Sequence, residues 1–155
     1  MKVTLLVVGK TTDARLETLI TEYTNRLKHY LTFEVRVIPE LSGKGKISMD
    51  IQKRQEGELI LKAVGNTFTI LLDEHGREYR SLDFAAHLQK LMSSGRDVTF
   101  VVGGPYGFSK DVYDRADGLI SLSQMTFSHQ MIRLLFVEQI YRAMTILRNE
   151  PYHHE

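Results

Sequence analysis

The carboxyl-terminal five residues combine side chains that could bind a ligand and transfer protons. Pro151-Tyr152-His153-His154-Glu155 places a phenol, two imidazoles and a carboxylate directly after a segment with the apolar spacing of a long helix. Chain ends usually fray because nothing ties them down, so this tail is either a disordered end or an element that closes over a pocket. Imidazoles titrate near neutral pH and serve as general acids and bases. Tyr152 and His153 are therefore candidate catalytic residues.

A second group of candidates lies on the segment that is expected to form the last helix. His129 and Arg133 are one helical turn apart and share a face, and Glu138 and Arg142 repeat that spacing. A solvated ion pair, worth roughly a few tenths of a kcal/mol, would explain Glu138 and Arg142. A helix-start residue bonded to nearby backbone would explain His129. The alternative interpretation is that these side chains act together on a substrate.

Two loops have the composition of a ligand pocket. Gly103-Gly104-Pro105-Tyr106-Gly107 lies between a strand pattern and a helix pattern, where glycines let the backbone approach a ligand. Its spacing differs from GxGxxG and from the GK[ST] loop, so a standard dinucleotide or P-loop site is disfavoured, and an ordinary tight turn explains it equally well. The stretch Leu122–Ser128 could wrap an adenine with backbone groups and apolar side chains, or it could simply connect a strand to a helix.

Composition narrows the class of protein. With 155 residues, the chain has the size of one domain, 1–155. Its net charge of +1 gives no overall positive field of the kind that indicates nucleic-acid binding. A local basic region, which is either a solvated loop or an RNA phosphate contact, contains Lys44, Lys46, Lys53 and Arg54. The absence of cysteine excludes disulfides and Cys-ligated zinc and fits the cytoplasm. We expect no metal, because the histidines lack ligand spacing, and no membrane span.

Strand patterns and helical periodicity alternate along the whole chain. The expected strands are 2–8, 33–38, 67–72, 97–102 and 119–123, and the expected helices are 13–30, 48–64, 81–93 with Ser81 as N-cap, 109–116 with Ser109 as N-cap, and 128–148. Continuous apolar strands that alternate with helices predict an α/β, Rossmann-like fold, with a mainly parallel sheet and helices on both faces. The alternating strand 33–38, which stops at a proline, suits an edge. Ligands bind at the carboxyl ends of such strands, so the loops 73–76, 103–107 and 123–128 compete as sites.

In combination, these motifs resemble one family. Gly103-Gly104-Pro105-x-Gly107, Leu122-Ser123-x-x-Thr126, Glu138-x-x-Tyr141-Arg142-Ala143 and the terminal Pro151-Tyr152-His153 follow one another in that order. The pattern is similar to that of the RlmH (YbeA) family, the smallest SPOUT methyltransferases, and the resemblance covers the entire chain.

The resemblance implies a fold and an activity that periodicity does not. It implies that the carboxyl-terminal part threads into a trefoil knot, which ordinary topology rules would reject, and that the protein is a homodimer. It also implies that S-adenosyl-L-methionine binds in the knot, and that N3 of a pseudouridine in large-subunit (23S) rRNA is methylated on assembled 70S ribosomes.

The resemblance also implies site residues. The expected cofactor-binding residues are Leu72, Gly103, Gly104, Leu122, Ser123, Gln124, Met125, Thr126 and Phe127. The expected catalytic, substrate-facing residues are His129, Arg133, Glu138, Arg142, Tyr152 and His153. This chain departs from the family where His154 replaces an arginine and where Ser128 and Gln130 replace prolines, which predicts a weaker RNA contact and a less rigid loop.

Two other functions remain open at this point. One is another SPOUT-like RNA methyltransferase, acting on tRNA or a different rRNA base. The other is a non-enzymatic module that binds an adenine nucleotide or the ribosome. So small a monomer has little surface for binding RNA. We therefore also expect that one subunit binds the cofactor while the partner's tail or basic loop helps to bind the rRNA.

Overall fold

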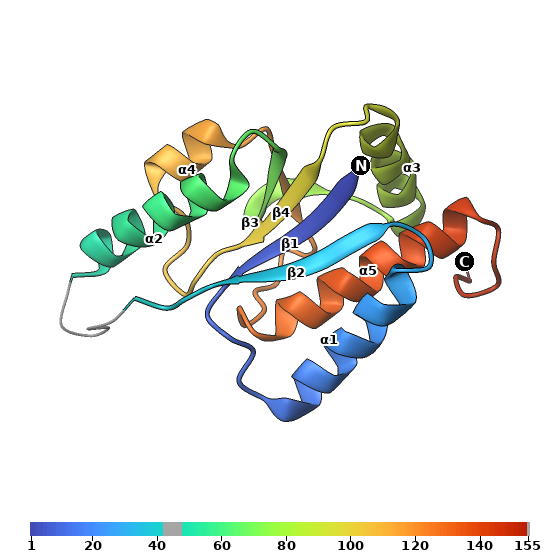
Figure 1. Ribbon diagram of the computed structural model, residues 1–155, viewed down its shortest axis with the longest axis horizontal. Helices are drawn as coiled ribbons and strands as arrows, with labels where there is room; N and C mark the ends of the chain where they lie inside the picture. Colours follow the sequence, from blue (N-terminus) through green and yellow to red (C-terminus); the bar gives the residue numbers. More distant parts are fainter. Residues whose placement is uncertain (42–47, 155) are drawn as a thin grey trace.

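The computed structural model describes residues 1–41 and 48–154, so Lys44 and Lys46 of the basic region lie outside the described residues. Within them, five strands form one parallel sheet in the order β2-β1-β4-β3-β5, as Figure 1 shows. The strands are β1 (Lys2–Val8), β2 (Thr32–Ile38), β3 (Phe68–Glu78), β4 (Val98–Val102) and β5 (Gly118–Ser121). The parallel sheet is confirmed, and β2 is an edge strand as its alternating pattern predicts.

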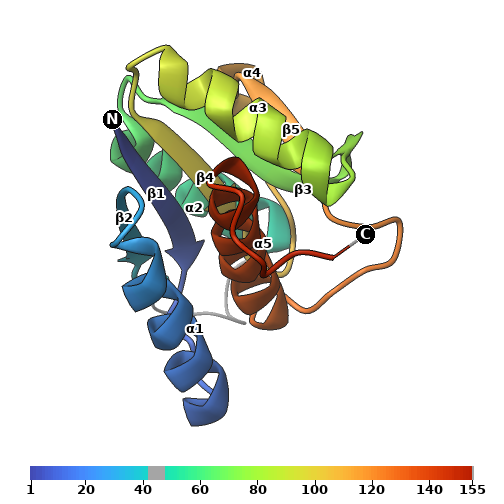
Figure 2. The same ribbon diagram turned by 90° about the vertical axis from the view of Figure 1, so that its right-hand side faces the viewer.

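Helices cover both faces of the sheet, as expected. They are α1 (Ala14–Leu27), α2 (Met49–Val64), α3 (Ser81–Ser93), α4 (Lys110–Arg115) and α5 (Met131–Leu147). Helices α1 and α3 flank α5 on one face, while α2 and α4 pack together on the other (Figures 1 and 2). Each face therefore has its own apolar layer.

The strand sequences explain this two-sided packing. In β1, Val3, Leu5 and Val7 belong to the apolar layer under α5, while Leu6 and Val8 belong to the layer under α2 and α4. Successive side chains of a strand point to opposite faces, so a strand that is buried on both sides must be apolar throughout. The chain therefore has the continuous apolar runs of a central parallel sheet.

Strand β3 is longer than its sequence pattern predicts. It continues through residues 73–78 instead of ending in a loop at Asp73, and its pairing with β5 shifts register between Leu72 and Arg77. Gly76 permits this close approach, since a methyl group there would lie 2.6 Å from the backbone of Ile120. The polar residues that suggested a loop therefore belong to a bulged strand.

The amino ends of two helices also differ from the expectation. Ser81 is not the N-cap of α3 but its first residue, because its hydroxyl donates to Gln139 Oε1 across to α5 (3.1 Å) and Arg80 takes the cap position. Helix α5 begins at Met131, and Ser128 Oγ accepts a hydrogen bond from the Met131 N–H at 3.0 Å. Ser128 thus holds the start of this helix.

Between β5 and α5 the chain crosses from one side of the sheet to the carboxyl end of β1. The Gln130 amide donates to the Lys10 carbonyl (3.1 Å) and accepts from the Thr12 N–H (2.9 Å), which fixes the end of the crossing. Gln130 therefore ties the end of this segment to residues 10–12 near the start of the chain. The trefoil knot itself stays a prediction.

Arg133 anchors this crossing from inside the protein. Its side chain is 1% exposed, and its guanidinium donates to the carbonyls of Val8 (2.7 Å), Gly9 (2.8 Å) and His129 (3.0 Å). A further bond reaches Thr11 Oγ1 at 3.1 Å. The guanidinium thus points into the protein, not toward the surface where we expected it to meet a substrate beside Glu138 and Arg142.

Replacing this guanidinium should mainly lower the stability of the protein, and should affect the chemical step of catalysis less. We expect Arg133→Met to lower the free energy of unfolding by about 3 kcal/mol, because it leaves several buried carbonyls without a donor. Urea unfolding followed by circular dichroism measures this loss. The matched control is Arg54→Met on the exposed side of α2, which should stay within about 0.5 kcal/mol of the parent. Equal stability of the two variants would contradict an anchoring role.

Candidate functional site

A cavity of about 620 Å³ opens at the carboxyl ends of β4 and β5, beside residues 72–75 of β3. This is the edge at which parallel α/β sheets bind ligands. Of the residues expected to bind a cofactor, those that line the cavity are Leu72, Gly103, Gly104, Leu122, Ser123, Met125, Thr126 and Phe127. Gln124 is exposed and is not part of the lining. The segments 72–75, 103–108 and 120–129 thus meet around one space.

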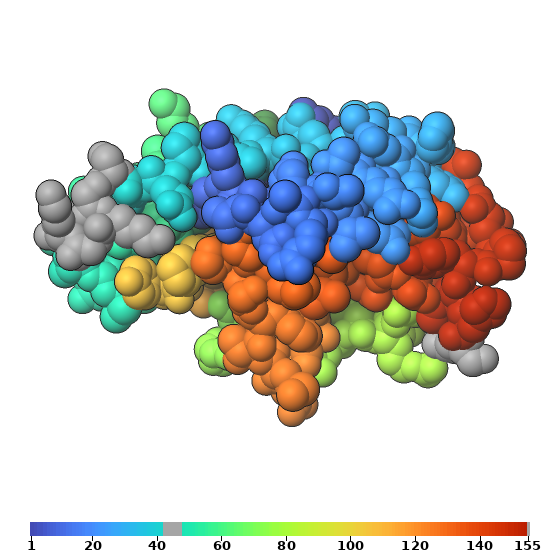
Figure 3. All heavy atoms as spheres, turned by 90° about the horizontal axis from the view of Figure 1, so that it is seen from below, coloured from blue at the N-terminus to red at the C-terminus, as the bar shows by residue number. Residues whose placement is uncertain are grey.

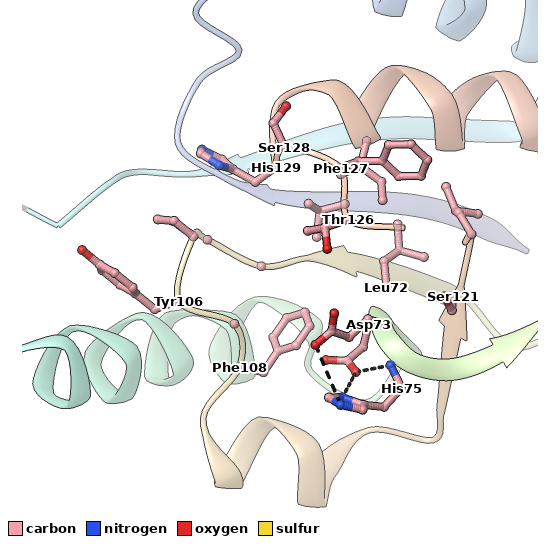
Figure 4. Close-up of a pocket in the computed structure, with 18 of the residues that line it drawn as sticks. Leu72, Asp73, His75, Tyr106, Phe108, Ser121, Thr126, Phe127, Ser128 and His129 are labelled. Carbon is pink, nitrogen blue, oxygen red and sulfur yellow. Dashed lines mark hydrogen bonds and ion pairs between the residues drawn. The ribbon is translucent and has the colours of Figure 1, made fainter. Parts of the chain in front are cut away.

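The close-up in Figure 4 shows how these segments surround the cavity. Thr126 and Phe127 lie on the same side as Ser128 and His129, whereas Asp73 and Phe108 lie across from them. Apolar side chains such as Leu72 and Phe127 alternate with hydroxyl and backbone groups. A pocket of this size and mixture suits a small organic ligand with a few polar groups.

Asp73 brings a carboxylate to this cavity. Its loop, 73–76, was one of the candidate sites, but Asp73 was not among the expected site residues. Its side chain is 9% exposed and accepts hydrogen bonds from the Tyr113 hydroxyl and the His75 N–H. Burial acts to raise the pKa of Asp73, but the hydrogen bonds from Tyr113 and His75 outweigh it and hold the pKa below its usual value. Burial and the bond to Asp73 raise the pKa of Tyr113. The wall therefore carries a negative charge at neutral pH.

A second polar cluster forms where the tail folds back onto α5. Glu138 Oε1 accepts from Arg142 Nη2 (2.7 Å), Arg142 Nε (3.1 Å) and the Tyr152 hydroxyl (3.0 Å). Arg142 Nη1 lies 3.1 Å from His153 Nδ1. Burial, followed by hydrogen bonds with Tyr23 and Glu138, raises the pKa of Tyr152, so this phenol keeps its proton at neutral pH. The structure thus brings together four of the residues predicted to be catalytic.

Aromatic rings hold the tail in place. The chain reverses after α5 at Asn149, which has a positive φ of 56°. The Tyr152 ring then packs edge-on against Tyr141 at a centroid distance of 4.8 Å, and the Tyr30 hydroxyl donates to Glu150 at 2.6 Å. Tyr152 and His153 are half-buried, whereas His154 is exposed. Tyr152 and His153 therefore pack against the fold instead of extending into solvent.

Within one chain, the predicted residues fall into separate groups. His129 lines the large cavity, and Arg133 is enclosed beneath the end of β1. Glu138 lines a smaller neighbouring cavity of about 290 Å³, which shares residues 120–122 and Phe127 with the large one. Tyr152 and His153 line neither of these two cavities.

Two further observations concern ligands and membranes. Among residues 1–41 and 48–154, no group of three or more histidine, aspartate or glutamate side chains could hold a metal ion. In the same part of the chain, no helix has the length and apolar character needed to cross a membrane.

Solved structures share this fold. A probable methylase family protein from Haemophilus influenzae superposes with a TM-score of 0.57 at 9% identity, covering 99% of this chain and 70% of that one. A putative RNA methyltransferase from Bacillus anthracis superposes with a TM-score of 0.54 at 12% identity, covering 99% of this chain and 98% of that one. At such low identity the likeness concerns the fold alone.

Sequence relatives extend the likeness along the whole chain. Proteins named ribosomal RNA large subunit methyltransferase H from Bacteroides thetaiotaomicron and Phocaeicola vulgatus are 57% and 55% identical, each over 100% of both chains. The family model described as predicted SPOUT methyltransferase matches residues 1–153. The chain therefore belongs to the SPOUT methyltransferase family.

Proposed function

We propose that this chain, as a single SPOUT domain, uses S-adenosyl-L-methionine to methylate N3 of a pseudouridine in large-subunit (23S) rRNA, acting on assembled ribosomes in the cytoplasm. One observation carries the proposal. The Gly103–Gly104 turn and the Leu122–Phe127 segment line one cavity, in a chain more than half identical to large-subunit rRNA methyltransferases from end to end.

The cavity fits the cofactor in size and chemistry. A volume of about 620 Å³ lies in the range of sites for ligands of this size. Leu72, Leu122 and Phe127 offer apolar contacts for an adenine, and the glycine turn offers backbone groups. The Asp73 carboxylate suits a ligand that carries hydroxyl groups and positive charge. S-adenosylmethionine supplies, when bound, a methyl group activated by a positively charged sulfur.

The residues of this chain then have three tasks: to orient the base, to exclude water and to take up the N3 proton. Glu138 Oε1 already accepts bonds from Arg142 and Tyr152, so Glu138 suits the task of orienting Arg142. The Arg142 guanidinium can stabilise negative charge on the base carbonyls once the proton leaves. His129 and His153 are the candidates for accepting that proton, and the Tyr152 ring can stack on the base.

A homodimer would join the two groups that one chain keeps apart. The segment before α5, drawn in orange, projects at the lower edge of the molecule in Figure 3. Its surroundings expose large apolar side chains: Met125 is 77% exposed and Met131 42%. Such side chains gathered at one place mark an interaction surface. We propose that a second copy covers them and brings its own tail to the cavity, and that the crossing segment forms the trefoil knot.

Methyl transfer from labelled S-adenosylmethionine tests the substrate. We expect label in the large-subunit rRNA of 70S ribosomes taken from cells that lack this protein, and none in tRNA. Ribosomes from cells that contain it are the control, because their target base is already methylated and should accept no label. Digestion and mass spectrometry should place the methyl group on a pseudouridine. Labelling of tRNA alone would replace this proposal with a different RNA substrate.

Removing the tail should abolish turnover and spare the fold. We expect truncation after Asn149 to slow methyl transfer at saturating cofactor by at least about 100-fold, because it removes the stacking ring and a candidate base together. Tyr152→Phe, which keeps the ring but loses the bond to Glu138, should fall between the truncated and complete chains. Thermal melting checks that both variants fold. Full activity of the truncated chain would exclude a catalytic tail.

The dimer is tested by placing a charge on the exposed apolar surface. We expect Met131→Asp to shift the protein from dimer to monomer in sedimentation velocity and to lower methyl transfer in parallel, because a carboxylate cannot be buried there without cost. Met49→Asp is the matched control, since Met49 is 54% exposed on α2 across the sheet. It should stay dimeric and active. A fully active monomer would rule out a shared site.

A further inference from the structure

Helix α2 buries a carboxylate directly against the glycine turn of the large cavity. Glu56 is 7% exposed, and its Oε1 accepts a hydrogen bond from the Gly104 N–H at 3.1 Å. Glutamate is seldom buried so deeply unless it is paired. An apolar side chain would fill this buried position at lower cost, so the presence of a carboxylate at the turn calls for a specific explanation.

The packing at Gly104 shows that the contact is closely fitted. A methyl group at Gly104 would lie 2.8 Å from Glu56 Oε2 and 2.9 Å from Oε1. The carboxylate therefore occupies the space where any other residue would have its side chain. The absence of a side chain at position 104 thus serves the contact with α2 on one side of the turn and leaves the backbone open to the cavity on the other.

The next residue on α2 supports the far end of the same loop. A methyl group at Gly57 would overlap the hydroxyl of Ser109, and Ser109 caps α4 through the Val112 N–H. Lys53, one helical turn before Gly57, lines the cavity. Helix α2 therefore contacts both ends of the 104–109 segment, and Gly107 N–H closes that segment internally by donating to the Gly104 carbonyl at 3.2 Å.

We infer that Glu56 is a positioning residue for methyl transfer, which holds the Gly103–Gly104 turn in the shape that binds the cofactor. A loop that is rigid before binding loses less conformational entropy when a ligand arrives. The carboxylate acts on the side of the turn away from the cavity, through the Gly104 backbone. This inference rests on the proposed function, because it takes the cavity to be the cofactor site.

Two substitutions at Glu56 distinguish the effect of side-chain length from the effect of charge. Glu56→Gln keeps an acceptor oxygen at the same distance, and we expect its Kd for S-adenosylmethionine by calorimetry to stay within about threefold of the parent. Glu56→Asp keeps the charge but withdraws it by one methylene, and we expect binding to weaken about tenfold, which corresponds to roughly 1.4 kcal/mol. Glu58→Gln and Glu58→Asp, on the exposed side of the same helix, are the matched controls and should bind like the parent.

A double-mutant cycle covers the case in which Glu56→Asp folds poorly. Gly104→Ala displaces the carboxylate, so it breaks the contact that Glu56→Ala removes. If the contact is real, the double variant should bind S-adenosylmethionine no more than about threefold more weakly than Gly104→Ala alone. The Tm of each variant without ligand measures its stability, and the increase in Tm on adding the cofactor measures its binding. Only the increase on adding the cofactor should differ between the variants.

The outcomes distinguish this inference from the proposed function. If the parent methylates rRNA but Glu56→Asp binds the cofactor like the parent, or if the two substitutions in the cycle are additive, Glu56 has no positioning role. If the parent itself binds no S-adenosylmethionine, the proposed function fails first. Weak binding by Glu56→Asp with parent-like binding by Glu56→Gln supports the inference.

Discussion

The structure depends on the return of the chain from β5 to the far side of the sheet, held by one buried guanidinium. Arg133 joins α5 to the end of β1 and the residue after it, through hydrogen bonds to the carbonyls of Val8 and Gly9. With that end fixed, the segment before α5 is stretched across the carboxyl ends of β4 and β3. It becomes a wall of the large cavity because it has to cross this edge to reach its anchor.

The same helix sets the position of the second cluster. Glu138 and Arg142 lie further along α5, and the turn at Asn149 brings Tyr152 and His153 back beside them. One rigid helix therefore carries the cavity wall at its beginning and the tail cluster near its end. In a single chain this geometry keeps the two apart, with the smaller cavity between them. A symmetric pair of such helices is a simple way to unite them.

Much of the secondary structure could be predicted from the sequence, because it depends on residues that are close together along the chain. Continuous apolar runs identified the buried strands, and Ser109 marked the start of α4, because both signals depend on near neighbours. Ser81 and the length of β3 were misjudged because their partners, Gln139 and Ile120, come from distant elements. Arg133 was expected to face a substrate because of its spacing from His129 and the family resemblance. Only the fold shows that carbonyls of β1 enclose it.

Some residues of the candidate site could likewise be predicted from the sequence, and others could not. The cavity residues followed from the motifs and the family resemblance, because a loop after a parallel strand always lies at the binding edge. Glu56 was missed, and Asp73 was recognised only as part of the loop 73–76, since their importance comes from contacts with Gly104 and Tyr113. A long-range contact of this kind leaves no local spacing pattern.

The bond between Arg133 and the end of β1 also bears on how the chain folds. It joins residues 124 and 125 positions apart, so the strand leaves the ribosome well before the helix. Until the helix leaves the ribosome, the carbonyls of Val8 and Gly9 must be satisfied by water. Contacts of such long sequence separation slow folding, because loop closure costs entropy before they form. We therefore expect the sheet to assemble first and the carboxyl-terminal helix to dock in the last and slowest step.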